Sequence, residues 1–216
     1  MMKHNWIKRN KRLSALAACA ALSCSLLAGC VDQSGGDAGE GTADGSASSQ
    51  TESVETMLEI TDPEEKAAVE AAKAKVQGME GEPRIIATSP STAEICDRLE
   101  LDLVGVCSSS ISELPERYAE AEEVGTAMAP DMEIVASLDP DWILSPATLQ
   151  ADLQPKYEAI DTDWAFLNLR SVQGMYRSIQ ELGEIFGREE QAQAMVDEFT
   201  EFYEDYKDTN EGKEAP

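Results

Sequence analysis

The chain has 216 residues and a formal net charge of −25 at pH 7, from 17 Lys and Arg against 42 Asp and Glu. This acidity argues against binding to nucleic acid and against an electrostatic grip on anionic lipid. The length allows one domain of ordinary size with flanking segments. Hydrophobic residues make up 42% of the chain and aromatic residues only 6%, so a core can form but contains few rings.

The first 30 residues have the pattern of a bacterial export signal. Five basic residues precede an apolar run over 13–27, which is shorter than the ~20 residues of a membrane span. The run ends in Leu27-Ala28-Gly29-Cys30, which resembles a lipobox, whose cysteine is lipidated and becomes the mature N-terminus. We therefore expect a signal peptide over 1–29 and a lipid, palmitate included, on Cys30 that anchors the protein on the outer face of the cell membrane. The alternative is a plain signal peptide with a chance cysteine.

A linker and a helix are predicted next. Residues 31–53 are rich in Gly, Ser and Asp, which predicts a flexible acidic tether over 30–60. Thr61-Asp62-Pro63-Glu64 has capping and proline signals in the order that opens a helix, so we expect a helical lead-in over 61–82. Removal of residues 1–29 would take away five basic and no acidic residues and bring the net charge to −30.

Few residues of the folded part suit disulfide or zinc chemistry. Apart from Cys30 and the signal, only Cys96 and Cys107 remain, and either a disulfide between them or two buried thiols is compatible with the sequence. The only histidine, His4, lies in the signal, which excludes a histidine-based zinc site in the folded part.

Strand and helix patterns alternate between residues 83 and 170. Strands are predicted over 84–89, 103–109, 141–146 and 164–169, and helices over 91–101, 130–138 and 148–160, the last interrupted at Pro155. This alternation predicts an α/β fold, a Rossmann-like lobe with a mostly parallel sheet and flanking helices. The first three strands end in small or polar residues, at the carboxyl edge where open α/β sheets bind ligands.

Two further helices are predicted over 171–210, with Ser171 as the N-cap of the first and a turn at Gly187. The second carries an apolar stripe made of Met195, Phe199, Phe202, Tyr203 and Tyr206. Such a stripe is more often core than a cofactor site. Because only ten residues follow Tyr206, we expect a partner or a missing part of the protein to cover its distal end.

Four segments between Arg84 and Tyr206 carry a family resemblance: RIIATSPSTAEICDRLELDLVGV, LPERY, VGTAMAPDMEIVASLDPDWILS and SVQGMYRSIQELGEIFGREEQAQAM. They resemble the solute-binding lipoproteins that feed ABC importers of haem, corrinoids and iron-siderophores, and most closely the haem-binding members. The resemblance implies two α/β lobes joined by one long rigid inter-lobe helix. This chain would hold the N-terminal lobe and the linking helix, with residues 211–216 starting the connection to an absent second lobe.

The resemblance also implies a role for Met128. In haem-binding relatives a methionine of this loop coordinates the haem iron, and a histidine of the second lobe takes the opposite side. Thioether sulfur is a soft ligand, and Met/His is an established axial pair for haem iron. The alternative is that Met128 fills a gap beneath the loop.

Hydroxyl-bearing residues at the strand ends are the other candidate ligand contacts. The connection from the first strand to its helix would present a helix N-terminus, with about +0.5 of a charge, to a haem propionate; alternatively, Ser91 or Thr92 only caps the helix. The relative carries an aromatic residue near Ser110, so the serine here weakens the case for haem. The complete candidate set is Ser89, Pro90, Ser91, Thr92, Ser108, Ser109, Ser110 and Thr148.

Glu133 matches the position at which related first lobes dock on arginines of the permease. The alternative is an ordinary first-turn glutamate that favours the helix dipole.

The resulting hypothesis is a lipid-anchored binding component that captures haem and delivers it to the subunits of an ABC permease. Alternatives are an iron-siderophore or corrinoid ligand, or a non-functional truncated remnant. Of the arginines between the first strand and the helix pair, Arg98, Arg117 and Arg170, none lies clearly at a strand's carboxyl edge, which favours haem or corrinoid over an anionic siderophore. We expect no enzyme, because the sequence after the signal has no histidine base, no GxSxG and no GxxxxGK[ST].

Overall fold

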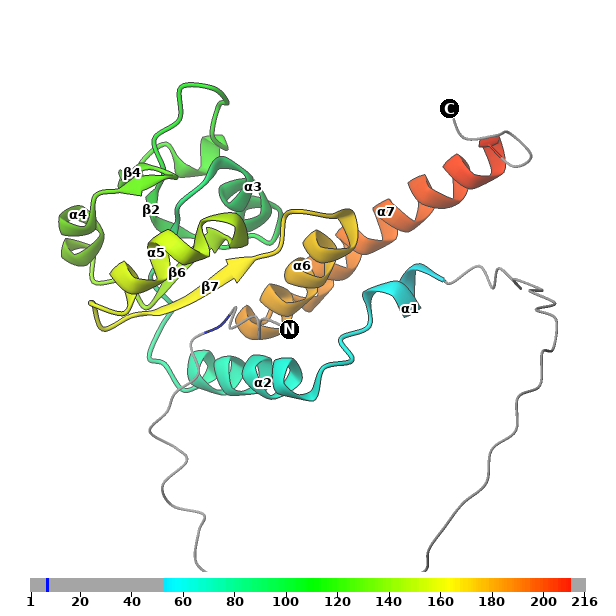
Figure 1. Ribbon diagram of the computed structural model, residues 1–216, viewed down its shortest axis with the longest axis horizontal. Coiled ribbons are helices and arrows are strands. Elements are labelled where there is room, and N and C mark those ends of the chain that lie inside the picture. The colour runs from blue at the N-terminus through cyan, green and yellow to red at the C-terminus, as the bar shows by residue number, and fades with distance from the viewer. Residues whose placement is uncertain (1–6, 8–52, 211–216) are drawn as a thin grey trace, which may run out of the picture. The chain divides into compact units, whose positions relative to one another are not determined.

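The computed structural model describes Ile7 and residues 53–210 (Figure 1). Cys30, nearly all of the predicted signal peptide, most of the predicted tether, and residues 211–216 lie outside the described residues. Within the described part, no helix is both long enough and apolar enough to cross a membrane.

A five-stranded sheet with strand order β3-β2-β1-β6-β7 forms the centre of the lobe. All four neighbouring pairs in it are parallel, which confirms the predicted α/β fold. The strands are β1 (Ile85–Ala87), β2 (Leu103–Val106), β3 (Glu122–Glu123), β6 (Trp142–Pro146) and β7 (Asp163–Leu167). Ile7 adds an isolated antiparallel bridge to Ala165 of β7. Strand β3 was not predicted, because two exposed glutamates carry no strand periodicity.

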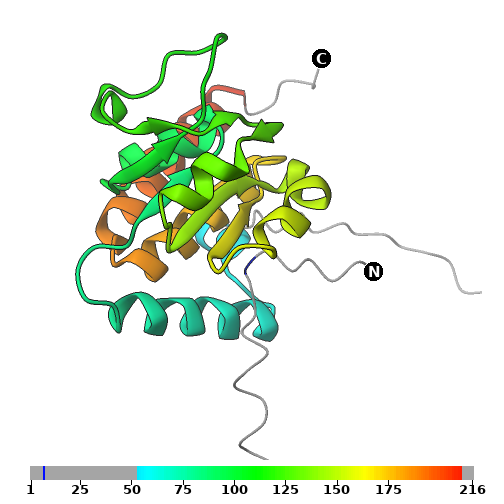
Figure 2. The same cartoon turned by 90° about the vertical axis from the view of Figure 1, so that its left-hand side faces the viewer.

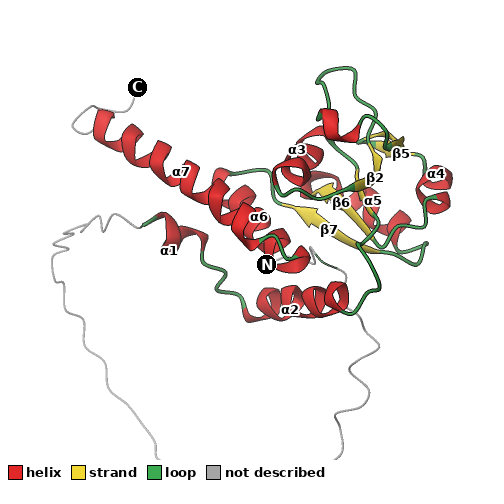
Figure 3. Ribbon diagram, turned by 180° about the vertical axis from the view of Figure 1, so that it is seen from behind, coloured by secondary structure: helices red, strands yellow, loops and turns green. Residues whose placement is uncertain are grey.

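Helices cover both faces of the sheet (Figure 3). Alternate side chains along each strand point to opposite faces, so Ile86, Ile143 and Trp164 pack with one set of helices while Ile85 and Leu144 pack with the other. The first set comprises α4 (Met132–Ser137) and α5 (Gln150–Tyr157), and the second includes α3 (Pro90–Arg98).

The predicted interruption at Pro155 is wrong, because α5 runs through this residue to Tyr157. Proline removes only the bond that its own N–H would donate four residues back, to the carbonyl of Ala151. The helix ends two residues later, so little of the helix depends on that missing bond.

Helices α6 (Val172–Phe186) and α7 (Glu189–Asn210) form a hairpin, as predicted. The Ser171 hydroxyl accepts a hydrogen bond from the N–H of Gly174 at 3.0 Å and caps α6. Gly187 ends the helix with φ of 67°, a left-handed conformation that favours glycine. A Cβ atom on Gly183 would lie 2.6 Å from Cβ of Ala192, so the close approach of the two helices requires glycine there.

The lead-in helix α2 (Pro63–Gln77) begins as predicted, with the Asp62 carboxylate accepting from the N–H of Glu64 at 2.7 Å. A shorter helix, α1 (Val54–Leu58), lies within the range predicted as tether, so that range extends too far towards the lobe. Arg177 of α6 donates from Nη2 to the carbonyls of Met57 and Glu59, both at 2.9 Å. These bonds anchor the C-terminal end of α1 on the helical hairpin.

Helix α1 changes the interpretation of the apolar stripe on α7. Val54 and Leu58 pack with Val196, Phe199 and Tyr203, and Phe199 also stacks on Tyr176 of α6 with ring centroids 4.6 Å apart. The middle of the stripe is therefore covered from upstream in the sequence. Its distal residues, Phe202 and Tyr206, are exposed, as expected.

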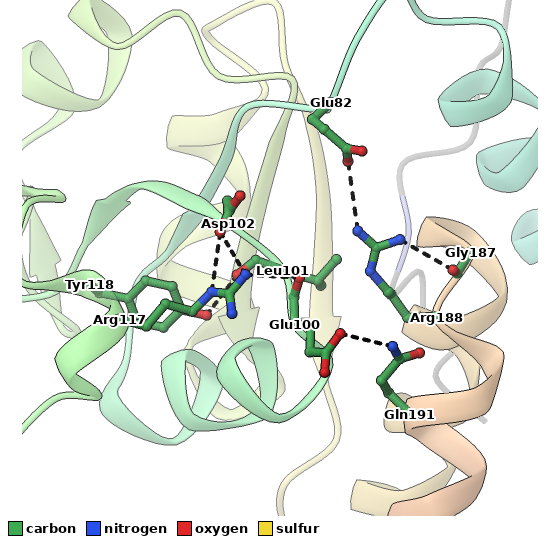
Figure 4. A network of polar contacts seen from close by, with 9 residues as sticks. All are labelled: Glu82, Glu100, Leu101, Asp102, Arg117, Tyr118, Gly187, Arg188 and Gln191. Atoms are coloured by element: carbon green, nitrogen blue, oxygen red, sulfur yellow. Dashed lines mark hydrogen bonds and ion pairs between the residues drawn. The ribbon is translucent and has the colours of Figure 1, made fainter.

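Polar contacts join this hairpin to the amino-terminal edge of the sheet (Figure 4). Arg188, in the α6–α7 turn, pairs at 3.9 Å with Glu82, which lies just before β1. Gln191 of α7 donates at 3.1 Å to the carboxylate of Glu100, which lies in the turn between α3 and β2. The hairpin is thus held at the edge opposite to the carboxyl ends of the strands.

Both cysteines of the folded part are free thiols in the structure, so the buried-thiol alternative applies and the disulfide alternative does not. Burial raises the pKa of Cys96 to about 12 and that of Cys107 to about 11. Such thiols are protonated at neutral pH and behave as small apolar side chains.

Candidate ligand-binding site

The connection from β1 to α3 brings the first group of predicted site residues to the carboxyl edge. Ser89 is the N-cap of α3, with its Oγ accepting from the N–H of Thr92 at 3.2 Å and lying 2.8 Å from Thr92 Oγ1. Because the Ser89 hydroxyl accepts this backbone N–H, the cap is Ser89 and not Ser91 or Thr92. The side chains of Ser89 and Thr92 are both buried. Ser91 is exposed and Pro90 is half-buried in the first turn of the helix. Ser91 therefore presents the hydroxyl that is open to a ligand.

A chain of buried hydroxyl groups lies beneath this edge. Thr88 Oγ1 is 2.6 Å from Ser145 Oγ, which in turn is 2.9 Å from the hydroxyl of Tyr157 on α5. Burial is the main cause that raises the pKa of Tyr157. These hydroxyl contacts fix the ends of β1 and β6 relative to each other. Sequence reasoning had no signal for the part played by Tyr157, because its partners come from two other elements.

The loop after β2 carries the three predicted serines. Ser109 Oγ accepts from the N–H groups of Ile111 and Ser112, at 3.3 and 3.2 Å, and so shapes the loop. Ser110 is exposed at the tip and Ser108 is half-buried at the base. The backbone N–H of Ser108 donates to the carbonyl of Gly125 at 2.8 Å. This bond joins the loop to the hairpin that contains Met128.

Met128 lies in the two-residue turn of an antiparallel hairpin, formed by β4 (Gly125–Thr126) and β5 (Ala129–Pro130). Gly125 has φ of +91°, and a Cβ atom there would lie 3.0 Å from the carbonyl oxygen of Ala129. The side chain of Met128 is 78% exposed. The alternative in which Met128 fills a gap beneath the loop is therefore wrong, because a side chain that fills a gap would be buried.

The far end of the loop after β2 is anchored at the opposite edge of the sheet (Figure 4). The short 3-10 turn η2 (Glu116–Tyr118) places Arg117 to donate to the carboxylate of Asp102 at 2.7 Å. The Tyr118 hydroxyl donates to the carbonyl of Leu101 at 2.8 Å. The loop is thus held at both ends, while its tip is exposed.

Two further predicted residues are exposed on neighbouring elements. Thr148 lies in the 3-10 turn η3 (Ala147–Leu149), directly after β6. Glu133 lies in the first turn of α4, where the Asp131 carboxylate caps the helix by accepting from the N–H of Glu133 at 3.0 Å. Within the described part of the chain, Glu133 forms no ion pair. Its carboxylate is available to a partner, and its place also fits a glutamate that favours the helix dipole.

The predicted site residues therefore share one edge of the sheet. Ser91, Ser110, Met128 and Thr148 follow the carboxyl ends of four strands that are neighbours in the sheet, and all four are exposed. Two cavities of about 260 and 510 Å³ are lined chiefly by residues of α1, α2 and α6, and no predicted site residue lines either. The edge is an open surface, as one side of a cleft would be.

Comparisons with known proteins agree with this architecture. A family model described as periplasmic binding protein matches residues 85–216, which is more than half of the chain. The high-affinity heme uptake system protein IsdE of Staphylococcus aureus (strain Newman) is 36% identical over 117 residues, covering 54% of this chain and 40% of that protein. The chain thus spans less than half the length of this curated relative.

Two solved structures share the fold. An ABC transporter substrate-binding protein from Listeria monocytogenes EGD-e is 40% identical with a TM-score of 0.61, over 63% of this chain and 52% of that one. S. aureus IsdE complexed with heme is 31% identical with a TM-score of 0.59, over 62% of this chain and 52% of that one. Given the family match, the parallel sheet and these relatives, the chain belongs to the periplasmic binding protein family.

Proposed function

We propose that this chain is part of the extracytoplasmic substrate-binding component of an ABC importer, and that it binds haem and delivers it to the permease. The observation that carries the proposal is the 78% exposed side chain of Met128, at the edge where parallel α/β sheets bind ligands. The 36% identity to a heme uptake protein supports haem as the ligand.

In this proposal Met128 coordinates the haem iron through its thioether sulfur. A sulfur atom at the tip of a hairpin can approach the iron without unpacking the core. The only histidine of the chain is His4, in the predicted signal peptide, so the opposite axial ligand would come from a second lobe. Met/His ligation is an established arrangement for haem iron.

The start of α3 is the proposed site for an acidic group of the ligand. Backbone N–H groups in the first turn of a helix and the hydroxyl of the exposed Ser91 both donate to anions. Buried Ser89 and Thr92, together with Pro90, would act by shaping this turn. Ser108, Ser110 and Thr148 would line the same edge, and Ser109 would hold the loop in shape.

The proposed partners are the permease subunits and the membrane. Glu133 would dock on a basic residue of the permease, and a lipid on Cys30 would hold the protein near it. We propose no catalysed reaction. The alternative ligands, a siderophore or a corrinoid, and the alternative of a non-functional remnant lead to different outcomes in the experiment below.

The test is a titration of the full chain with haemin, followed by the Soret band. Met128→Leu removes the sulfur and keeps the volume, so we expect haemin affinity to fall at least about tenfold. Met132→Leu is the matched control, since Met132 is half-buried in α4 and packs against the core. We expect no change in affinity for this variant.

Equal affinity of Met128→Leu and the wild type would remove the proposed ligand. If the wild type shows no saturable band, the same titration on a longer protein that includes a second lobe separates a missing lobe from a wrong ligand. Absence of binding there as well would rule out haem and leave the siderophore, the corrinoid or the remnant.

A further inference from the structure

Ile111 is the most exposed large hydrophobic side chain among the described residues, at 97%, and Met128 follows at 78%. Single exposed aliphatic residues are common on protein surfaces, so exposure alone decides nothing. Two further observations set Ile111 apart, namely how its loop holds it and where it lies.

Hydrogen bonds in the loop hold Ile111 away from the core. Ser109 Oγ accepts from the N–H of Ile111 at 3.3 Å and from that of Ser112 at 3.2 Å, which closes a tight turn around the isoleucine. Leu114, the next large apolar residue, is half-buried and packs against the core. The loop therefore separates its two apolar side chains, with one half-buried and one presented to solvent.

Ile111 and Met128 belong to adjacent segments of the same edge. Ile111 follows β2 and Met128 follows β3, and these two strands pair with each other. The N–H of Ser108 donates to the carbonyl of Gly125 at 2.8 Å, which ties the base of the loop to the base of the hairpin. Figures 1 to 3 show the loop after β2 and the hairpin at the same, upper end of the lobe.

We propose that Ile111 is a specificity-determining residue that packs on the apolar face of a planar macrocycle, and that Ser109 is the positioning residue that presents it. This inference rests on the proposed function. It separates two contributions: Met128 recognises the iron, whereas Ile111 recognises the ring whether or not iron is present. A compact charged chelate offers no such apolar face, so the loop selects for macrocycles.

The experiment compares haemin with metal-free protoporphyrin IX, titrated against the full chain and followed by absorbance and by porphyrin fluorescence. Ile111→Asn keeps the same number of non-hydrogen side-chain atoms and removes the apolar surface, so both affinities should fall by about tenfold. Met128→Leu should lower the haemin affinity alone. Ile111→Leu should stay within about threefold of the wild type for both compounds.

Two further variants test the role of Ser109 and the specificity of the effect. Ser109→Ala should weaken both porphyrins by about threefold through loss of the turn, and Ser109→Thr, which keeps the hydroxyl, should restore binding. Phe202→Asn is the matched control, because Phe202 is also an exposed apolar residue, at 68%, but lies on α7. It should bind both porphyrins as the wild type does.

The results distinguish this inference from the proposed function. Unchanged binding of both porphyrins by Ile111→Asn, or an effect on haemin alone, would overturn the ring contact while leaving the role of Met128 intact. An Ile111 effect on protoporphyrin without any Met128 effect on haemin would support the ring contact and overturn iron ligation. If the wild type binds neither compound, the titrations are repeated on the longer protein that includes a second lobe, and absence of binding to both compounds there would overturn both ideas.

Discussion

The carboxyl edge of the sheet and the helical side of the lobe differ in how far their side chains are exposed to solvent. At the edge, Met128 and Ile111 expose large apolar groups to solvent. On the helical side, where α1 and α2 pack on α6 and α7, even the carboxyl group of Glu181 is buried, at 2% exposure. The difference suggests that the helical side supplies stability, whereas the edge can change to suit a ligand without loss of the fold.

The surroundings of Glu181 illustrate the packed side. Its Oε1 atom has no hydrogen-bond partner among the described residues, and it lines the cavity of about 260 Å³ together with Glu65 of α2 and Arg177 of α6. Burial, followed by the nearby Glu65 carboxylate, raises the pKa of Glu181 to about 9, and Arg177 opposes this shift. The group is thus protonated at neutral pH in the folded protein.

The largest effect should come from Glu181→Gln, which replaces the protonated acid by a neutral group of the same shape. Between pH 4.5, the ordinary pKa of the group, and about 9, the folded protein holds a proton that the unfolded chain lacks. This contribution to stability is therefore full below pH 4.5 and declines as the pH rises to about 9. The substitution should raise the free energy of unfolding by roughly 3 kcal/mol at pH 8 and by little at pH 4.5.

Urea denaturation of both proteins at several pH values gives this difference, and the comparison cancels the titration of the other carboxyl groups. A difference in stability that does not change with pH would show that Glu181 is already ionised in the folded state. The contrast between a packed helical side and an open edge would then lose its main support.

A smaller effect should come from Gly183→Ala at the α6–α7 contact. Alanine normally stabilises a helix interior relative to glycine, but here the new Cβ would lie 2.6 Å from Cβ of Ala192. We expect a loss of about 2 kcal/mol in the free energy of unfolding, measured by urea denaturation. Gly78→Ala is the control, because its nearest neighbour, the carbonyl oxygen of Ala74, would be 3.4 Å away. Equal stability of the two variants would mean that the helices separate without cost.

The smallest effect on stability should come from the edge itself. Met128→Leu and Ile111→Asn replace exposed side chains, so each should change the free energy of unfolding by less than about 0.5 kcal/mol. Thermal and urea denaturation of the unliganded chain measure this directly. A loss of 2 kcal/mol or more in either variant would show that the residue supports the fold, and the edge would then resemble the helical side.

Local patterns in the sequence determined much of this architecture. The alternation of apolar strands with helices predicted the parallel sheet, and the caps at Asp62 and Ser171 and the turn at Gly187 lie where they were predicted. These features depend on residues a few positions apart, so the sequence reveals them. The hydroxyl-bearing residues at the carboxyl edge follow from the same pattern, because parallel strands all end at one edge.

Contacts between distant segments decided the rest. The stretch that contains α1 was predicted as tether. It forms a helix because α6 and α7 offer it apolar partners and the guanidinium of Arg177. Whether a hydroxyl is open or engaged, as with Ser91 and Ser89, depends on the turn that surrounds it. The sequence alone placed Met128 in the connection just before the helix predicted over 130–138, whereas β3, the strand that precedes it, was found only in the structure. Only the tertiary structure decided that the Met128 side chain is exposed, because burial depends on what the rest of the chain packs against that position.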